Sequence, residues 1–309
     1  MDIQPFSVND GDGIRTTVFL AGCPLRCRWC SNPEGFACRE LVGWYMRKCI
    51  GCGACSAVCP QGIGIDLNAG RDKCVTCGAC VSVCPAGARD YMVRLMDASD
   101  VLREIQRHRL FYSQSGGGVT FSGGEATQQQ DLLRYLTREL YDMGYSLDIE
   151  TSGYFDFDRV SDILRRMDLV FMDLKIFDDE RHQLYTSVSN KKILANIARL
   201  SELPCEKVIR IPVIGGVNDS EDNIRASARY VHTVLPEARM ELLPYHELGR
   251  IKYEAAGVPY SPEIPDSIKL SSAVEPASIP AVFTRPSEEQ MEHLRSIIRE
   301  ECVTLADFR

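Results

Sequence analysis

The sequence lacks any long apolar run, and no stretch approaches the roughly 20 apolar residues that a membrane-spanning helix needs. The first twenty residues carry Asp2, Asp10, Asp12 and Arg15 and have no apolar segment of the secretory-signal kind. Basic residues are not in excess either, because 35 Lys and Arg stand against 43 Asp and Glu, for a net charge of −8. These absences predict a cytoplasmic protein that has neither a membrane nor a nucleic acid as a partner.

Cysteine, by contrast, is abundant, with 14 residues in a chain of 309. In an intracellular protein so many cysteines indicate metal binding or catalysis rather than disulfides. Eleven of them fall in three tight groups between Cys23 and Cys84. The other three, Cys38, Cys205 and Cys302, have no ligand spacing and are expected to be small buried apolar residues.

The first group spaces Cys23, Cys27 and Cys30 as Cys-x3-Cys-x2-Cys in one loop, directly after an apolar run at residues 17–20. Three thiolates can hold three irons of a [4Fe–4S] cube and leave the fourth iron without a protein ligand. An open coordination position distinguishes reactive metal centres from closed structural ones. An incomplete zinc site or core cysteines would be the alternative, but no fourth ligand stands at zinc-finger spacing.

The two later groups form an internal repeat with a period of 25 residues, in which Cys-x2-Cys-x2-Cys-x3-Cys-Pro occurs at 49–60 and again at 74–85. In two-cluster bacterial ferredoxins with this spacing, the fourth cysteine of each run binds the other cluster. The two predicted ligand sets are Cys49, Cys52, Cys55 and Cys84, and Cys59, Cys74, Cys77 and Cys80. Two zinc sites are the alternative, which eight cysteines at this spacing disfavour. Residues 36–90 are therefore predicted to be an inserted α+β ferredoxin-like domain with two closed, electron-carrying clusters.

The rest of the chain, residues 1–35 and 91–309, alternates between apolar runs and amphipathic helical patterns. Strands are expected at residues 17–20, 119–122, 147–150, 169–175, 208–213 and 240–245. This alternation indicates parallel βα units, and so an α/β fold built as a partial (β/α)6 TIM-like barrel. A last helix is expected at 287–300, after a long loop rich in Pro and Ser at 258–286.

The string Cys23-Pro-Leu-Arg-Cys27-Arg-Trp-Cys30 resembles the cluster loop of radical S-adenosylmethionine (SAM) enzymes. The longer stretch from Asp10-Gly-Asp-Gly-Ile-Arg15 through Asn32-Pro-Glu34 is similar to one branch, the activating enzymes of glycyl-radical enzymes. Members with a ferredoxin-like insert match this layout over nearly the whole chain. The resemblance implies a barrel of the radical SAM type, three [4Fe–4S] clusters, SAM as cosubstrate, and a reduced flavodoxin or ferredoxin as electron donor. It also implies that Asp10 and Arg15 face the glycine loop of the partner enzyme.

The resemblance continues at later strand ends. Ser122-Gly-Gly-Glu125 resembles the motif that approaches the methionine end of SAM, and Asp173-Leu-Lys175 resembles an Asp-x-Lys whose Lys meets the SAM carboxylate. The family also implies a monovalent cation, although this chain has Glu150 where a well-known member has Asp. Without the resemblance, these residues would be strand-end charges facing water. The implied SAM contacts are Trp29, Cys30, Ser31, Gly123, Gly124, Glu125, Glu150, Thr151, Asp173, Leu174, Lys175, Arg210 and His246.

The function implied is reductive cleavage of SAM to a 5′-deoxyadenosyl radical, which removes a hydrogen from one backbone glycine of a partner glycyl-radical enzyme. No side chain is expected to act as a nucleophile, acid or base. One alternative is a radical SAM maturase or small-molecule enzyme with auxiliary clusters, although such enzymes usually place the extra cysteines after the barrel. Another is an electron-transfer ferredoxin fused to a structural domain, which gives the first cysteine group no purpose. Aryl-acetate decarboxylases, glycerol or propanediol dehydratases, choline lyase and isethionate lyase all fit as partners.

Overall fold

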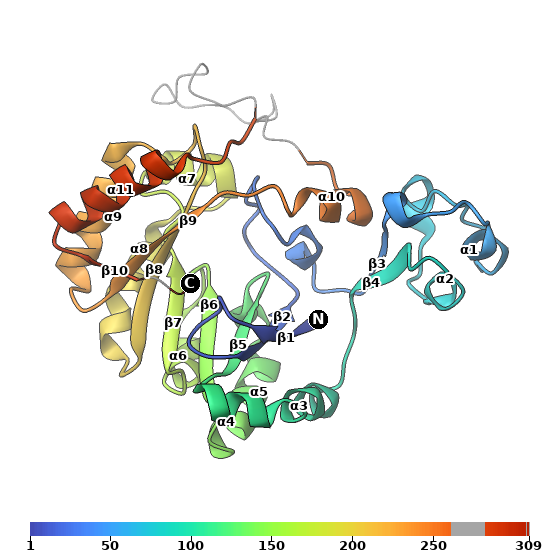
Figure 1. Cartoon of the computed structure of the whole chain (residues 1–309), viewed down its shortest axis with the longest axis horizontal. Helices are drawn as coiled ribbons and strands as arrows, with labels where there is room; N and C mark the ends of the chain where they lie inside the picture. The colour runs from blue at the N-terminus through green and yellow to red at the C-terminus, as the bar shows by residue number, and fades with distance from the viewer. Residues whose placement is uncertain (261–281, 307, 309) are drawn as a thin grey trace.

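A computed structural model describes residues 1–260, 282–306 and 308, and an eight-stranded sheet forms its centre (Figure 1). The strands lie in the order β1-β2-β5-β6-β7-β8-β9-β10. Their bounds are β1 Asp2–Ser7, β2 Arg15–Leu20, β5 Gly118–Gly123, β6 Ser146–Thr151, β7 Leu169–Asp173, β8 Glu206–Val213, β9 Arg239–Pro244 and β10 Thr304–Leu305. From β2 to β10 every neighbouring pair is parallel, whereas β1 runs antiparallel to β2 at the edge.

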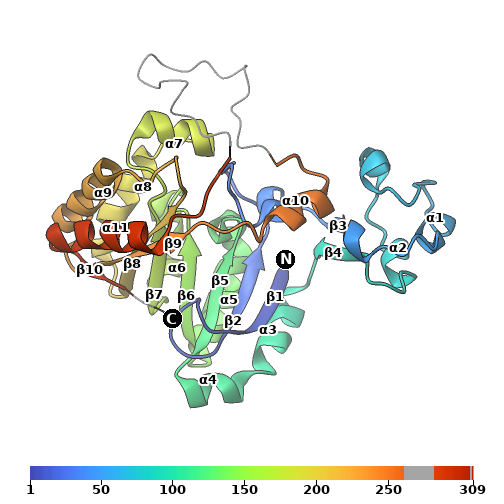
Figure 2. The ribbon, with the colours of Figure 1, turned by 45° about the horizontal axis from the view of Figure 1, so that its top comes forward.

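Helices join the parallel strands and cover the outer face of the sheet (Figure 2). They are α3 Ala98–Gln106, α4 Arg109–Ser115, α5 Gln130–Asp142, α6 Phe157–Leu164, α7 Asp179–Thr186, α8 Lys191–Arg199, α9 Glu221–Val234, α10 Arg250–Ala256 and α11 Glu288–Glu300. In α5, Leu133, Leu136 and Leu140 recur on one face and are fully buried against the sheet. The predicted α/β fold with its six parallel strands, and the predicted last helix, are therefore confirmed.

Two edge strands were not expected from the sequence. In β1 most side chains are exposed, and β10 has only two residues, so neither strand carries an apolar run. The predicted loop at 258–286 lies mostly outside the described residues. Within the described part of the chain, no helix combines the length and apolar composition needed to cross a bilayer.

A separate lobe stands beside the barrel and is built around a two-stranded antiparallel sheet, β3 Leu41–Trp44 with β4 Arg89–Val93 (Figures 1 and 2). Two short helices, α1 Ala54–Ala57 and α2 Ala79–Ser82, lie within the two cysteine runs. The glycines that precede them, Gly53 and Gly78, have φ angles of 75° and 76°. The repeat in the sequence is thus also a repeat of the backbone, while the assignment of residues 36–90 as a ferredoxin-like domain stays a prediction.

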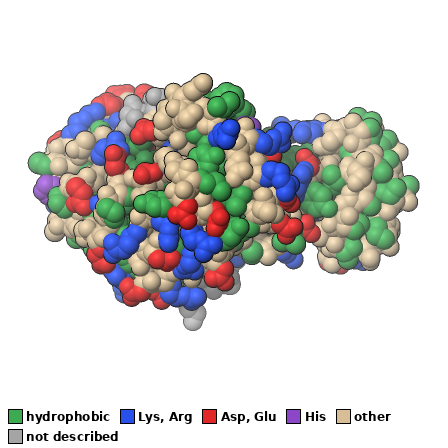
Figure 3. Space-filling model, turned by 90° about the horizontal axis from the view of Figure 1, so that it is seen from below, with side chains coloured by type: hydrophobic (Ala, Val, Ile, Leu, Met, Phe, Trp, Pro, Cys, Tyr) green, Lys and Arg blue, Asp and Glu red, His purple; other side chains and the backbone are tan. Residues whose placement is uncertain are grey.

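The surface of the lobe differs from that of the barrel. Seen from below, apolar side chains gather on the lobe, whereas Lys, Arg, Asp and Glu side chains are interspersed over the barrel (Figure 3). Four exposed apolar residues each adjoin a cysteine of the repeat: Ile50, Val58, Val75 and Val83. The short chain of the lobe therefore leaves part of its apolar surface uncovered.

The three isolated cysteines differ in burial. Cys205 is buried in the main core, as expected. The prediction is wrong for Cys38 and Cys302, which are both exposed. Cys38 lies where the chain leaves the barrel for the lobe, and Cys302 has a φ of 60° in the turn after α11. Both are connecting positions, which run over the surface.

Candidate active site at the mouth of the barrel

The loop that carries the first cysteine group follows β2 at the carboxyl ends of the parallel strands. The backbone N–H groups of Arg26 and Arg28 donate to carbonyls of the last two residues of α7, at 2.8 and 3.1 Å. Leu25 and Trp29 are buried in a second apolar cluster, where they alternate with the cysteines. The loop is therefore held by backbone hydrogen bonds and apolar packing, and Trp29 acts as one of its anchors.

The three thiols of this loop lie in a site where charge is poorly solvated. Burial raises the pKa of Cys23 and of Cys27 to about 12, and that of Cys30 to about 11. As thiols these groups are therefore neutral at physiological pH, and a bound metal is what would hold them as thiolates. The candidate ligands on this loop are thus three thiols. A donor set of this kind suits iron–sulfur chemistry.

Tyr253, on α10, supports the same interpretation. Its hydroxyl group is buried and has no hydrogen-bond partner among the described residues. Burial, together with the nearby Cys30 and Cys27, raises the pKa of this phenol, so it is a donor without an acceptor. A cluster sulfur would supply that acceptor, so the residues present fit an anionic iron–sulfur group.

The two glycines after β5 allow backbones to approach closely. A β-carbon on Gly124 would lie 2.6 Å from the carbonyl oxygens of Gly22 and Gly35, and the Gly124 N–H donates to the Leu20 carbonyl at 2.8 Å. Gly123 has a φ of 112°, which side chains rarely adopt. These glycines therefore allow the end of β5 to pack closely against the backbone on either side of the cysteine loop. Their contact with SAM stays a prediction.

Glu125, which follows them, is 1% exposed and ties two strand ends together. Its carboxylate accepts hydrogen bonds from the hydroxyl groups of Thr127 and Thr151 at 2.8 Å and of Ser152 at 2.5 Å. The backbone N–H of Ser152 donates to it as well, at 2.8 Å. The ends of β5 and β6 are thus locked together, and a direct contact between Glu125 and the SAM ammonium stays a prediction.

Lys175 and Asp173 form an ion pair beside the cysteines, at the end of β7. The Lys175 Nζ lies 2.5 Å from the Asp173 carboxylate, and its side chain is 11% exposed. Burial by itself lowers the pKa of Lys175, but the negative charge of Asp173 and its hydrogen bond outweigh this effect and the pKa is raised. A fixed ammonium at this position suits a carboxylate of a bound ligand, as the Asp-x-Lys motif predicts.

Substituting Lys175 with Met is expected to weaken SAM binding about 10- to 100-fold, because a charge-assisted hydrogen bond is worth about 1.5–3 kcal/mol. The matched control is Lys191→Met, which removes the ammonium of a lysine whose side chain is 82% exposed. Equilibrium binding of SAM to the loaded, oxidised enzyme measures both variants. Equal affinities for the two variants would contradict the predicted contact.

Arg210 lies inside the barrel between two carboxylates. Its guanidinium pairs with Glu150 at 2.5 Å and with Glu241 at 2.7 Å, and it lies 3.5 Å from the centre of the Phe171 ring. Glu150 also accepts a hydrogen bond from the hydroxyl group of Ser122 at 2.5 Å. Glu150 and Asp173 are thus both paired with basic side chains, and the monovalent cation stays a prediction.

The remaining predicted SAM contacts have different surroundings. His246 is exposed, after the end of β9. Leu174 is fully buried in the core, and Ser31 is half-buried. A β-carbon on Gly249, at the start of α10, would lie 2.8 Å from the Ser31 Cα, so the segment that carries His246 packs on the cysteine loop.

Arg15 lies at the other, amino-terminal end of the strands. Its side chain is 1% exposed, pairs with Asp148 at 3.0 Å and donates to the Thr120 hydroxyl at 2.7 Å. A direct contact between Arg15 and a partner does not agree with this burial, and Arg15 instead fixes the preceding loop from inside. Asp10 is half-buried and accepts from the Thr17 hydroxyl at 2.5 Å, so its contact with a partner stays a prediction.

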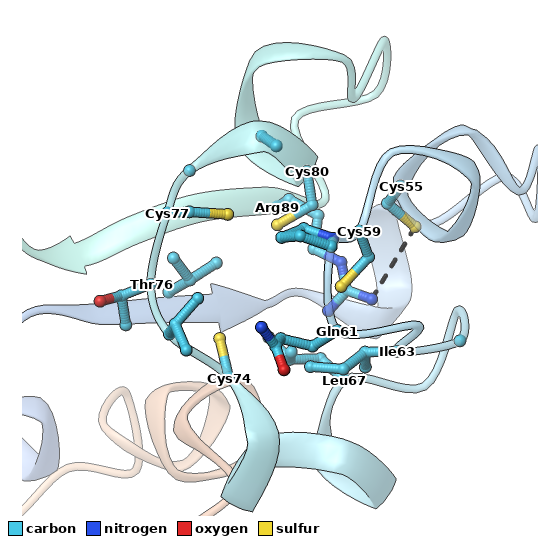
Figure 4. A pocket seen from close by; sticks show the side chains of 16 residues that line it. Cys55, Cys59, Gln61, Ile63, Leu67, Cys74, Thr76, Cys77, Cys80 and Arg89 are labelled. Atoms are coloured by element: carbon cyan, nitrogen blue, oxygen red, sulfur yellow. Dashed lines mark hydrogen bonds between the residues drawn. The ribbon is translucent and has the colours of Figure 1, made fainter.

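The cysteines of the repeat line two cavities of the lobe, and Cys55 lines both of them. The two predicted ligand sets stay a prediction. The cavity in Figure 4 is lined by Cys59, Cys74, Cys77 and Cys80, together with Cys55. The second is lined by Cys49, Cys52, Cys55 and Cys84. Arg89 borders both, and its Nη1 is buried without a partner in the described structure. A buried donor of this kind fits anionic clusters on either side.

Several residues of these sites were not found from the sequence. Ser152 follows the predicted contact Thr151, whereas Glu241 lies in β9 and Tyr253 in α10. In the sequence, each looks like an ordinary helix or strand residue. Arg89 follows the second Cys-Pro run, and a single Arg there carries no recognisable signal. Spatial neighbours rather than sequence neighbours identify all four.

Comparison with known proteins agrees with this geometry. Residues 17–227 match the model of the radical SAM superfamily. The chain is 39% identical over 270 residues to the (2S)-3-sulfopropanediol dehydratase activating enzyme of Klebsiella oxytoca, which covers 84% of this chain and 85% of that protein. It is 35% identical over 304 residues to the trans-4-hydroxy-L-proline dehydratase activating enzyme of Clostridioides difficile, covering 96% and 94%. A radical SAM methyltransferase from Sphaerobacter thermophilus shares the fold, with a TM-score of 0.52, 14% identity and coverage of 98% and 76%. The chain therefore belongs to the radical SAM superfamily and, within it, to the activating enzymes of glycyl-radical enzymes.

Proposed function

We propose that this protein activates a partner glycyl-radical enzyme in the cytoplasm by generating a radical on one of its backbone glycines. The observation that carries the proposal is the set of three thiols at the barrel mouth, where Cys27 is buried and Cys23 and Cys30 are half-buried. They lie beside the Lys175 side chain, which is only 11% exposed. When bound there, a [4Fe–4S] cluster and SAM supply a 5′-deoxyadenosyl radical by one-electron cleavage of a C–S bond, and this radical takes the glycine hydrogen.

The protein's own residues would bind the cofactors and exclude water. Cys23, Cys27 and Cys30 would be the ligands to three irons, and one iron would stay free for the amino and carboxylate groups of SAM. Lys175 would pair with the SAM carboxylate, and Tyr253 would donate to a cluster sulfur. The apolar packing of the cysteine loop against α7 supports a dry site, in which these electrostatic contacts are strong.

The lobe would supply the electron. Its two cavities support one closed cluster bound by Cys49, Cys52, Cys55 and Cys84, and a second bound by Cys59, Cys74, Cys77 and Cys80. A closed cluster has no open iron for a substrate, so it carries electrons. The donor to the lobe would be a reduced flavodoxin or ferredoxin.

Helix α10 supports a connection between lobe and barrel (Figure 2). Its first turn adjoins the cysteine loop through Gly249. At its end, the carbonyls of Glu254 and Ala255 accept hydrogen bonds from Asn68 at 2.9 Å and from Arg71 at 2.8 Å. The Arg71 carbonyl in turn accepts the Cys74 N–H at 3.1 Å. The cluster bound by Cys74 would therefore be the one next to α10 and would pass the electron onward.

Anaerobic reconstitution tests the proposal. The loaded chain is expected to hold about twelve irons, to form 5′-deoxyadenosine when SAM and a reductant are added, and to leave a glycyl radical on the partner. The partner to test first is any glycyl-radical enzyme that is encoded beside this gene. A chain that binds zinc instead of iron, or never cleaves SAM when reduced, would contradict the proposal.

A further inference from the structure

Arg89, the first residue of β4, lies between the two cavities of the lobe. Its side chain borders both of them, as does Cys55, and it is only 3% exposed. Figure 4 shows the side chain reaching in among Cys55, Cys59 and Cys80. The two proposed cluster sites thus share one guanidinium.

The guanidinium is held by groups that carry no full negative charge. Nη2 donates to the Ile65 carbonyl and lies 3.9 Å from Sγ of Cys55. The guanidinium carbon lies 5.4 Å from the centre of the Trp44 ring, which fixes its plane further. Among the residues that the structure describes, Nη1 has no hydrogen-bond partner and no carboxylate pairs with Arg89.

Such a cation is costly unless something compensates it. A guanidinium stays protonated in proteins, so burial cannot remove its charge. An uncompensated buried charge is strongly destabilising, and an unmade hydrogen bond adds to the cost. A cubane cluster with four thiolates carries net negative charge, and its sulfur atoms accept hydrogen bonds. A cluster in either cavity would therefore supply both things that Arg89 lacks.

We propose that Arg89 is a shared donor and positive charge for the two lobe clusters and raises the reduction potential of both. The inference rests on the proposed function, which places a cluster in each cavity. Reduction adds one electron from the donor, and hence one negative charge, to a cluster. A fixed cation nearby stabilises the reduced form more than the oxidised form, and burial strengthens this effect. Arg89 is thus a positioning residue: it stabilises the reduced lobe clusters, which hold the electron before its transfer to the barrel.

The test is a redox titration of the full-length, anaerobically reconstituted protein without SAM, followed by electron paramagnetic resonance. In Arg89→Met, the reduced-to-oxidised ratio of both lobe clusters at a fixed potential is expected to fall about tenfold or more. Arg89→Lys keeps the charge but loses the planar donors, and should lie between the two. The control is Arg94→Met, which removes an Arg whose side chain is 56% exposed, and should leave the ratio unchanged.

The outcomes separate this inference from the proposed function. If R89M loads both lobe clusters and titrates like the wild type, Arg89 does not raise their reduction potential. The proposed function with three clusters is then unaffected. If the wild type never loads the lobe, the proposed function itself fails. If R89M takes up no iron, the inference is tested instead by comparing the thermal unfolding of iron-free R89M with that of iron-free wild type. The inference expects iron-free R89M to be at least as stable as iron-free wild type, because an unpaired buried cation is gone, and a lower Tm would overturn it.

Discussion

Replacing Cys27 with Ala is expected to abolish SAM cleavage completely. Cys27 is the middle cysteine of its loop and is 8% exposed, so no neighbouring side chain or bulk solvent can readily take its place. With two thiolates the loop cannot hold a cube that leaves a single iron open, and the iron content should fall by about four. The measurement is 5′-deoxyadenosine formed anaerobically with excess dithionite, together with iron per chain.

Two matched Cys→Ala variants show whether this loss is specific. Cys77→Ala removes a proposed ligand of the lobe and should still cleave SAM with dithionite, but should lose most cleavage with a protein donor. Cys205→Ala removes a cysteine buried in the main core and should change neither the iron content nor the cleavage. If the Cys27 variant cleaves SAM as fast as the wild type, the cysteine loop is not the reaction site.

Replacing Arg15 with Met is expected to lower the free energy of unfolding by about 3–5 kcal/mol, because it leaves a buried carboxylate without its partner. Arg15 and Asp148 are 1% and 3% exposed, and they lie 3.0 Å apart. Urea unfolding of the iron-free chain measures the effect. A partner-binding role alone would leave stability unchanged and weaken only activation of the partner.

The same variant should become less stable relative to wild type as the pH rises. Burial raises the pKa of Asp148 to about 7, against the opposing effect of Arg15. A carboxyl whose folded-state pKa exceeds its unfolded value of about 3.9 contributes stability at low pH that is lost as the pH rises through the folded-state pKa. Without Arg15 the folded-state pKa rises further, so the deficit should be larger at about pH 8.5 than at about pH 6. If the variant loses the same free energy of unfolding at both pH values, Arg15 does not stabilise the charged form of Asp148 in the folded protein.

The sequence predicted the strands of the barrel because each is a buried apolar run bounded by turns. It could not predict β1, whose mostly exposed side chains give no such signal. Nor could it predict β10, whose two residues pair with β9 after α11 has returned the chain to that strand. Cys38 and Cys302 are exposed because they lie in connections that run over the surface. The number and spacing of cysteines do not show which connections these are.

The grouping of candidate site residues was predictable where those residues are also close in the chain. The three cysteines and the Asp173–Lys175 pair are local motifs, and the structure places them at one barrel mouth. Arg210 and Glu150 are 60 residues apart and meet because their strands flank β7. Glu150 is in register, through Phe171, with Val208, and Arg210 lies two residues further along the same strand. The burial of Arg15 likewise depends on strand pairing, which places it at the amino-terminal end of the parallel strands beside Thr120 and Asp148.

The most direct test of the central claim is the transfer of hydrogen from glycine to the adenosyl group. The partner glycyl-radical enzyme is prepared with glycine deuterated at Cα, and 5′-deoxyadenosine is analysed by mass spectrometry after one turnover with the loaded, reduced protein. We expect one deuterium in 5′-deoxyadenosine for each glycyl radical formed on the partner. If 5′-deoxyadenosine forms without deuterium and the partner carries no radical, this chain does not activate a glycyl-radical enzyme.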